Sequence, residues 1–276
     1  MLLSRLRKSL WMQSLKARVF ALAGRHYSNH RWYGPYRDIE LKNALLSPFN
    51  GALPAGYGRW LDERLVEYPW FFSQVPQDAK NLLDAGSTLN HNFILDHAAL
   101  RDKKITIMTL APEENSFPER GISYLYGDLR HTPFPDESFD CVACLSVLEH
   151  IGLDTTIYSS TAGQVEHDPE GYRAAVAEFR RVLKPGGSCL ITIPFGHRDV
   201  RSWVQVLDAA MVARIVADFR PSQFAAQYFR YTENEDWQVS TQAECSGAVY
   251  FDLNHDVPWP GCPAAAGAVA CLHLVK

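Results

Sequence analysis

The spacing of apolar and polar positions divides the middle of the chain into strand-like and helix-like segments. Short apolar runs between turn residues predict strands at 82–83, 105–110, 122–126, 139–147 and 189–194. Apolar residues three or four positions apart predict helices at 91–100, 169–182 and 208–219. Two later apolar runs, at 224–231 and 268–275, bring the predicted strands to seven. Strands that alternate with helices predict an α/β fold with a mostly parallel sheet and helices on both faces.

The helix before the fifth strand has the clearest predicted boundaries. Asp168 can cap it, and Pro169 fits the first helical position, where no backbone N–H is needed. Its predicted buried stripe consists of Tyr172, Val176, Phe179 and Val182. The Lys-Pro-Gly-Gly sequence at 184–187 should end it.

The N-terminal part differs from the rest in charge and pattern. The first 37 residues contain no Asp or Glu, and their basic residues are Arg5, Arg7, Lys8, Lys16, Arg18, Arg25, Arg31 and Arg37. Apolar residues recur there at helical spacing, namely Leu3, Leu6, Leu10, Trp11, Leu15, Val19 and Leu22. Residues 1–30 therefore predict a basic amphipathic helix suited to peripheral contact with an anionic membrane, too polar to span it. A helix that caps the main domain, a frayed terminus and a mitochondrial transit peptide are the alternatives.

Proline and glycine are frequent in residues 33–58, which predicts an irregular connector. In residues 59–76, Leu61, Leu65, Tyr68 and Phe72 have helical spacing, so a helix should pack against the sheet or cover a pocket. We therefore divide the chain into a helical extension with its connector, residues 1–58, and a main domain, residues 59–276.

Composition narrows the function classes. With 276 residues, 47% hydrophobic content and a formal charge of −4, the chain fits one globular domain with an extension and does not favour a nucleic-acid partner. Six scattered cysteines indicate a reducing compartment, and we expect a cytoplasmic protein, with peripheral contact at the inner membrane face if the N-terminal helix binds lipid. Cys141 and Cys144 lie within one predicted strand and should point to opposite faces, which disfavours a shared metal. No other ligand spacing indicates a metal site.

Several motifs follow one another in a fixed order. They begin with LLDAGSTLN from Leu82, continue with GDLRHTPFPDESFD from Gly127 and LSVLEHIG from Leu145, and end with RVLKPGGSCLITIPFG from Arg181. This order resembles the class I S-adenosylmethionine (SAM) dependent methyltransferases, in particular those of methyltransferase type 11. The resemblance implies a Rossmann-like seven-stranded fold and SAM as the cofactor, bound across the carboxyl ends of the strands.

The resemblance also assigns cofactor-binding positions. Gly86 would let the turn approach the ligand, Asp84 would interact with the cationic amino acid part of SAM, and Ser87 and Asn90 would add polar contacts. The remaining positions implied by the resemblance are Asp128 for the adenine amino group, Leu129 for a backbone N–H to the ring, and Ser146 and Glu149 beneath the methionyl part.

Two positions depart from the family pattern. The first turn keeps one glycine of the usual three, and Thr109 stands at the end of the second strand, where the family has an acid for the ribose hydroxyls. Glu113 and Glu114 follow in a loop and are candidate replacements. The alternative interpretation is that Glu113 and Glu114 are exposed loop acids that bind no ligand.

An alcohol acceptor needs a base, and histidine suits that role near neutral pH. His150 and His197 follow the fourth and fifth strands on the expected acceptor side and are the candidate catalytic residues. The motif combination also resembles bacterial methyltransferases of surface polysaccharide synthesis, which implies O-methylation of a sugar hydroxyl on a nucleotide-linked or lipid-linked glycan. The alternative is a noncatalytic methyltransferase-like binding module. A nicotinamide oxidoreductase is disfavoured because the first turn lacks the GxGxxG sequence.

Overall fold

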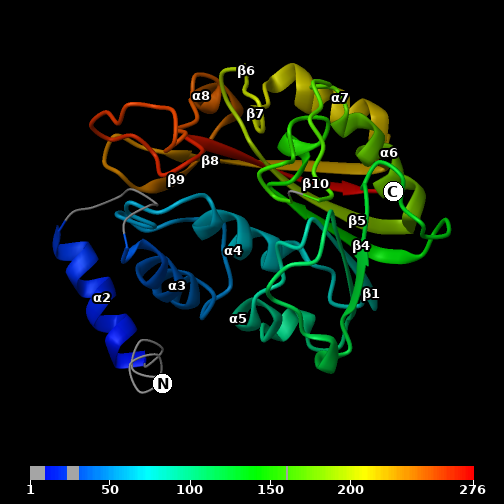
Figure 1. Ribbon diagram of the computed structural model, residues 1–276, viewed down its shortest axis with the longest axis horizontal. Coiled ribbons are helices and arrows are strands. Elements are labelled where there is room, and N and C mark those ends of the chain that lie inside the picture. Colours follow the sequence, from blue (N-terminus) through cyan, green and yellow to red (C-terminus); the bar gives the residue numbers. More distant parts are fainter. Residues whose placement is uncertain (1–9, 24–30, 160) are drawn as a thin grey trace.

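The computed structural model describes residues 10–23, 31–159 and 161–276 (Figure 1). Its main sheet has eight strands in the order β3-β2-β1-β4-β5-β10-β8-β9. These strands are β1 Asn81–Ala85, β2 Lys104–Thr109, β3 Ser123–Tyr126, β4 Phe139–Leu145, β5 Leu183–Pro194, β8 Gln223–Tyr231, β9 Trp237–Ser240 and β10 Ala268–Val275. Strands β1 to β5 are parallel, while β10, β8 and β9 pair antiparallel. The predicted mostly parallel α/β sheet is confirmed, and β9 adds an eighth strand that the sequence pattern did not predict.

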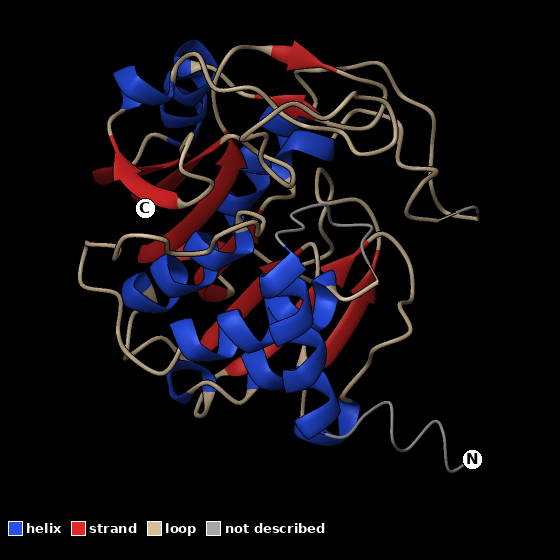
Figure 2. Cartoon of the chain, turned by 90° about the vertical axis from the view of Figure 1, so that its left-hand side faces the viewer, coloured by secondary structure: helices blue, strands red, loops and turns tan. Residues whose placement is uncertain are grey.

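The helices form layers on both faces of this sheet, as Figure 2 shows. The α-helices are α2 Leu10–Ala23, α3 Tyr33–Ala44, α4 Arg64–Gln74, α5 Asn92–Leu95, α6 Tyr172–Val182, α7 Ala209–Phe219 and α8 Gln242–Cys245. Three short 3₁₀ turns, η1 Ala98–Leu100, η2 Pro118–Arg120 and η3 Leu148–His150, and a small sheet of β6 Asp199–Val200 and β7 Gln205–Val206 complete the structure.

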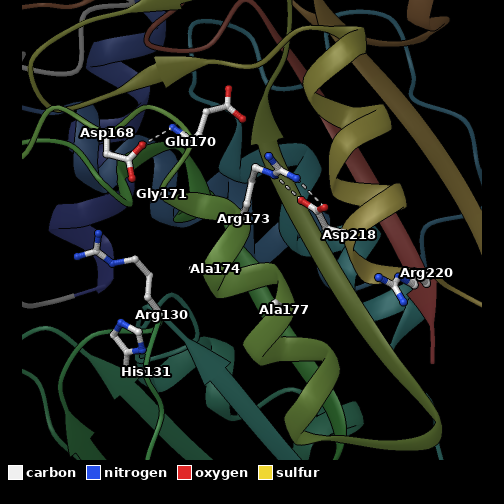
Figure 3. Close-up of a pocket in the computed structure, with 10 residues that line it drawn as sticks. All are labelled: Arg130, His131, Asp168, Glu170, Gly171, Arg173, Ala174, Ala177, Asp218 and Arg220. Carbon is white, nitrogen blue, oxygen red and sulfur yellow. Dashed lines mark hydrogen bonds and ion pairs between the residues drawn. The ribbon is translucent and has the colours of Figure 1, made fainter.

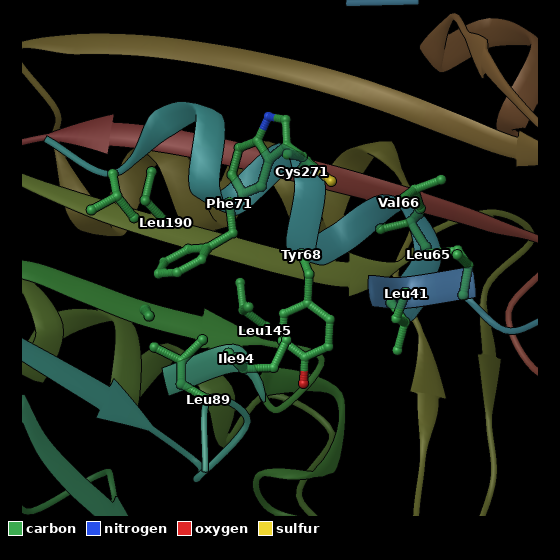
Figure 4. Close-up of a cluster of buried hydrophobic side chains, with 14 of the residues drawn as sticks. Leu41, Leu65, Val66, Tyr68, Phe71, Leu89, Ile94, Leu145, Leu190 and Cys271 are labelled. Carbon is green, nitrogen blue, oxygen red and sulfur yellow. The ribbon is translucent and has the colours of Figure 1, made fainter. Parts of the chain in front are cut away.

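Two hydrophobic cores lie on opposite faces of the sheet, one under α3, α4 and α5 and the other under α6 and α7. Figure 4 shows the first, where Phe71 of α4 packs with Leu145, Leu190 and other side chains of the strands. Cys141 belongs to this core and Cys144 to the other, so the two thiols point to opposite faces as predicted. All six cysteines are buried.

Two predicted helices begin or break at other residues. The helix predicted over 91–100 is interrupted at His97, which is extended and whose ring accepts a bond from the Ala99 N–H at 3.2 Å. This side-chain bond starts a separate turn, η1, in place of a continuous helix. Helix α6 starts at Tyr172, because residues 168–171 form a tight turn that is closed by a bond from the Gly171 N–H to the Asp168 carbonyl at 3.0 Å.

The connector predicted over 33–58 is wrong in its first part, where α3 forms. Pro35 is the third residue of α3, within the first turn, where a missing N–H costs no helical bond. Tyr33 and Leu41 are buried and hold α3 in the core. Residues 45–58 are irregular, as predicted. The basic residues of 1–9 and Arg25 lie outside the described part of the chain.

Helix α4 confirms the predicted helix of 59–76 and lies over the strand ends that carry the motifs. Pro69 inside α4 cannot donate to the Leu65 carbonyl, and the Tyr57 hydroxyl donates to that carbonyl instead, at 2.6 Å. The Trp237 indole N–H donates to the Leu61 carbonyl at 2.9 Å just before the helix. The Trp237 bond fixes the start of α4 against the last third of the chain, and the Tyr57 bond fixes it against the connector.

Candidate active site

The turn after β1 is shaped by a buried carboxylate. Asp84 is fully buried, and its oxygens accept bonds from the Leu89 N–H at 2.8 Å and from the Thr88 N–H and hydroxyl at 3.2 Å each. Burial raises the pKa of Asp84 to about 7, although these bonds oppose the shift. Gly86 and Ser87 both have positive φ, 110° and 67°. Asp84 therefore holds the backbone of the turn in the form that the cofactor would meet.

Gly86 is required by the protein itself. A Cβ at this position would overlap the Val147 side chain, which follows β4. The approach of a ligand is the reason expected for this glycine from the family resemblance. The structure adds a close contact between two neighbouring turns as a reason that needs no ligand.

Glu113, in the loop after β2, lies beside this turn. Its carboxylate accepts bonds from the Ser87 hydroxyl at 2.8 Å, the Asn90 amide at 3.3 Å and the Thr109 hydroxyl at 3.3 Å. The residue is exposed, so its oxygens are accessible at the surface of the turn. Thr109, Ser87 and Asn90, predicted separately, thus converge on Glu113. A carboxylate at this point fits the two adjacent hydroxyls of a ribose, each of which donates one bond.

Asp128 has a protein partner in this structure. Arg130 donates from Nε and Nη2 to its carboxylate at 2.7–3.1 Å, and the same guanidinium donates to both oxygens of Glu166 at 2.6 and 2.7 Å. These bonds lower the pKa of Asp128 against the effect of burial. Asp128 thereby anchors the loop that carries Glu166, and its predicted contact with adenine stays a prediction. The Leu129 side chain is buried in the core under α6 and α7.

Helix α4 joins the ends of β4 and β5 through Glu67, which the sequence analysis did not single out. One Glu67 oxygen accepts bonds from the hydroxyls of Ser146 and of Thr192, the latter at 2.6 Å, and the other binds Arg64 Nη1 at 2.6 Å. Ser146 has φ 48°, and its N–H donates to Thr192 Oγ1 at 3.0 Å. The signal in the sequence was a lone acid in an apolar helical segment.

Glu149 and His150 follow β4 in the turn η3. Glu149 is 2% exposed, and one of its oxygens has no hydrogen-bond partner among the described residues. Burial raises the pKa of Glu149 well above its usual range. Glu149 therefore carries a buried carboxyl group with free bonding capacity at the predicted methionyl side.

His150 is held in one tautomer. Its Nδ1 lies 2.7 Å from the Trp203 carbonyl, which can only accept, so Nδ1 carries the proton. Its Nε2 lies 3.1 Å from the Tyr158 hydroxyl and is left as an acceptor. The ring stacks on Trp203 at 5.4 Å, and burial lowers the pKa of His150 to about 4. His150 is thus a neutral imidazole with an acceptor nitrogen at physiological pH.

His197 lies in a different environment. Its side chain is exposed in the loop between β5 and β6, and its backbone N–H donates to the Ala248 carbonyl at 2.8 Å. The two candidate bases therefore differ in burial and in hydrogen-bond partners, and both catalytic roles stay predictions.

A cavity of about 670 Å³ lies on the α6 and α7 side (Figure 3). Charged pairs occupy much of its lining: Arg173 binds Asp218 at 2.6 Å, and Arg130 is held by Asp128 and Glu166. The turns after β1 and β2 do not line it. Among the described residues no group of three His, Cys, Asp or Glu side chains could hold a metal ion.

Known proteins match part of this chain. Residues 105–191 match the methyltransferase domain family. Malonyl-(acyl-carrier protein) O-methyltransferase of Yersinia pestis is 32% identical over 160 residues, which are 54% of this chain and 51% of that protein. The chain thus spans about half the length of this relative.

Two solved structures are similar at low identity. The YcgJ protein from Bacillus subtilis has a TM-score of 0.46 and 14% identity over 76% of this chain and 97% of that chain. The 1,6-didemethyltoxoflavin-N1-methyltransferase from Burkholderia thailandensis, solved with S-adenosylhomocysteine, has a TM-score of 0.45 and 12% identity over 97% and 90% of the two chains. The chain therefore contains, at residues 105–191 from β2 into β5, a segment that matches the methyltransferase domain family.

Proposed function

We propose that the protein is an O-methyltransferase that transfers the methyl group of SAM to a hydroxyl oxygen, with His150 as the base. One observation supports this proposal: His150, in the turn after β4, is neutral, and its Nε2 can accept a proton. The Tyr158 hydroxyl lies 3.1 Å from that nitrogen. The hydroxyl oxygen gains positive charge as its bond to the methyl carbon forms and the sulfur–methyl bond breaks, so its proton becomes acidic enough for a weak neutral base of this kind to accept.

The residues divide into two groups in this proposal. Asp84 shapes the first turn, Glu113 would bind the ribose hydroxyls, and Glu149 would face the methionyl part. When bound, SAM supplies a methyl group on a sulfonium sulfur, which is already activated for transfer. His150 Nε2 accepts the proton of the hydroxyl, directly or through Tyr158, and the Trp203 carbonyl keeps the other proton on Nδ1.

The finer proposal for the acceptor is a sugar hydroxyl on a nucleotide-linked or lipid-linked glycan, as in polysaccharide biosynthesis. Three aromatic rings surround the base: Trp203 stacks on His150, Tyr158 meets it edge-on at 5.2 Å, and Tyr250 meets Trp203 edge-on at 6.3 Å. Exposed aromatic faces stack well on sugar rings, and Tyr158 is 54% exposed. Tyr228 and Tyr231 of β8 and Trp237 of β9 are buried and serve packing.

A carboxyl oxygen of an acyl chain is the second candidate acceptor. The Yersinia relative, a malonyl-(acyl-carrier protein) O-methyltransferase by name, favours it. A carboxylate is already deprotonated at neutral pH and needs no base. The two acceptors therefore differ in whether His150 is required.

The test starts with calorimetric titration of the full chain with SAM and S-adenosylhomocysteine, with NAD as a control. Transfer of labelled methyl is then measured with nucleotide-linked sugars and with malonyl-(acyl-carrier protein), for the wild type and His150→Gln. Methylation of a sugar that His150→Gln abolishes would support the proposal. Methylation of the malonyl group that survives in His150→Gln would replace it with the second candidate. A folded protein that binds neither SAM nor S-adenosylhomocysteine would favour the noncatalytic module.

A further inference from the structure

Helix α2 presents an apolar stripe to the solvent. Trp11, Leu15 and Leu22 are 60%, 48% and 88% exposed, and Arg18 between them is also exposed. The four residues are spaced i, i+4, i+7 and i+11, which places them on one face of the helix. Three large apolar side chains on one exposed helix face are typical of a binding surface. We name Trp11, Leu15 and Leu22 the α2 stripe.

The opposite face of α2 attaches the helix to the protein. Phe20 is fully buried, and its ring packs against Tyr36 at 4.9 Å and edge-on against Tyr33 at 6.1 Å and Trp60 at 6.3 Å. The helix is therefore already fixed through Phe20, and the α2 stripe is not needed for packing against α3. Figure 1 shows α2 at the outer edge of the molecule, with α3 between it and the sheet.

The charge around the stripe selects among partners. The charged residues of α2 are Lys16 and Arg18, both cationic, and the first acid of the whole sequence is Asp38. A second copy of the chain on the stripe would bring Arg18 against another cation. An anionic lipid surface would instead attract both cations while the apolar residues enter the acyl boundary. The described residues contain no helix with the length and apolar character that crossing a bilayer requires.

We propose that α2 lies flat on an anionic phospholipid bilayer, with Trp11, Leu15 and Leu22 inserted and the long side chain of Arg18, which lies among them, extended to the headgroups. This proposal stands independently of the methyl acceptor, because it rests on α2 alone.

The contacts of α3 extend this docking toward the active site. The Tyr33 hydroxyl and Arg37 donate to Asp62 at 2.8 and 3.1 Å, just before α4, and Glu67 of α4 binds the Ser146 hydroxyl. Docking through α2 therefore holds the α4 side of the protein near the membrane. An acceptor carried by a lipid would be found on that side.

The experiment is co-sedimentation of the full chain with vesicles, without SAM or acceptor. Vesicles of phosphatidylcholine with a quarter phosphatidylglycerol are compared with pure phosphatidylcholine vesicles. The double variant Leu15→Asp, Leu22→Asp should lower the partition coefficient on anionic vesicles about tenfold or more, since two apolar side chains lose their burial. Arg18→Gln should weaken binding to the anionic vesicles and leave the weak binding to neutral ones unchanged.

The matched control is Leu46→Asp, the same change at a leucine that is 81% exposed beyond the end of α3. It should bind vesicles like the wild type, and circular dichroism should show that all variants are folded. Equal binding of the double variant and Leu46→Asp would overturn the proposal, and so would a wild type that ignores anionic vesicles. A dimer seen by light scattering, lost in the double variant and without vesicle binding, would show that the stripe joins two copies instead.

Discussion

The carboxylate of Glu67 accepts a hydrogen bond from the hydroxyl of Ser146, a residue 79 positions later in the chain. Glu67 is fully buried, and Thr192 and Arg64 supply its other bonds. A buried carboxylate is tolerated only when its oxygens are satisfied, so these partners keep α4 on the ends of β4 and β5.

Replacing Glu67 should therefore destabilise the protein. Glu67→Gln leaves Arg64 without its charge partner and puts an amide where both oxygens accepted bonds. We expect a loss of about 3 kcal/mol in the free energy of unfolding, measured by urea denaturation. Glu114→Gln, which changes an exposed acid in the same way, is the control and should alter stability by less than about 0.5 kcal/mol. Equal stabilities of the two variants would show that the Glu67 bonds do not hold α4.

Glu113 should carry ribose binding. Glu113→Gln should weaken SAM affinity about 10- to 100-fold, the range for a hydrogen bond to a charged group. Glu114→Gln removes the same charge one residue away and should leave the affinity unchanged. Calorimetry on both variants measures this difference. If both variants bind SAM like the wild type, the loop acid does not replace the family carboxylate.

Glu67 and Glu113 show how far the sequence could predict the site. Each motif is local, so the resemblance of these motifs to the family could place Asp84, Gly86 and the turn after β4. Alignment of the apolar run put Thr109 at the end of β2. The acid that lies beside the turn after β1 is Glu113, four residues later, and the loop after β2 brings it there. Glu67 could not be assigned, because its partners Ser146 and Thr192 meet it only after the sheet has formed. The connector at 33–44 was misread because Pro35 sits where a helix accepts proline.

The pH dependence of methyl transfer should identify the base. Burial lowers the pKa of His150 to about 4, so its Nε2 stays unprotonated as the pH falls from 8 to 5. If His150 is the base, the acidic limb of kcat/KM should lie well below the usual histidine range near 6.5. Tyr158→Phe should lower kcat with little change in SAM affinity. If the acidic limb of kcat/KM lies near pH 6.5 and persists in His150→Gln, the base is another residue.

The carboxyl of Glu63 should make stability depend on pH. It is buried at the start of α4 with one oxygen 3.3 Å from the Ala266 N–H, and burial with the charges of Asp62 and Glu67 raises its pKa from 4.5 to about 8. Between these values the folded state holds a proton that the unfolded state has lost, so stability falls as the pH rises from about 4.5 to 8.

Glu63→Gln removes the titrating carboxyl group and keeps an oxygen that can accept a hydrogen bond from the Ala266 N–H. The variant should match the wild type near pH 4.5 and exceed it by a few kcal/mol near pH 9, since each pKa unit corresponds to about 1.4 kcal/mol. Asp84, whose pKa is also raised, titrates in both proteins, so the difference between their curves isolates Glu63. Urea denaturation at several pH values measures both curves. Parallel curves would mean that Glu63 is ionised in the folded protein, with Arg64 compensating its charge.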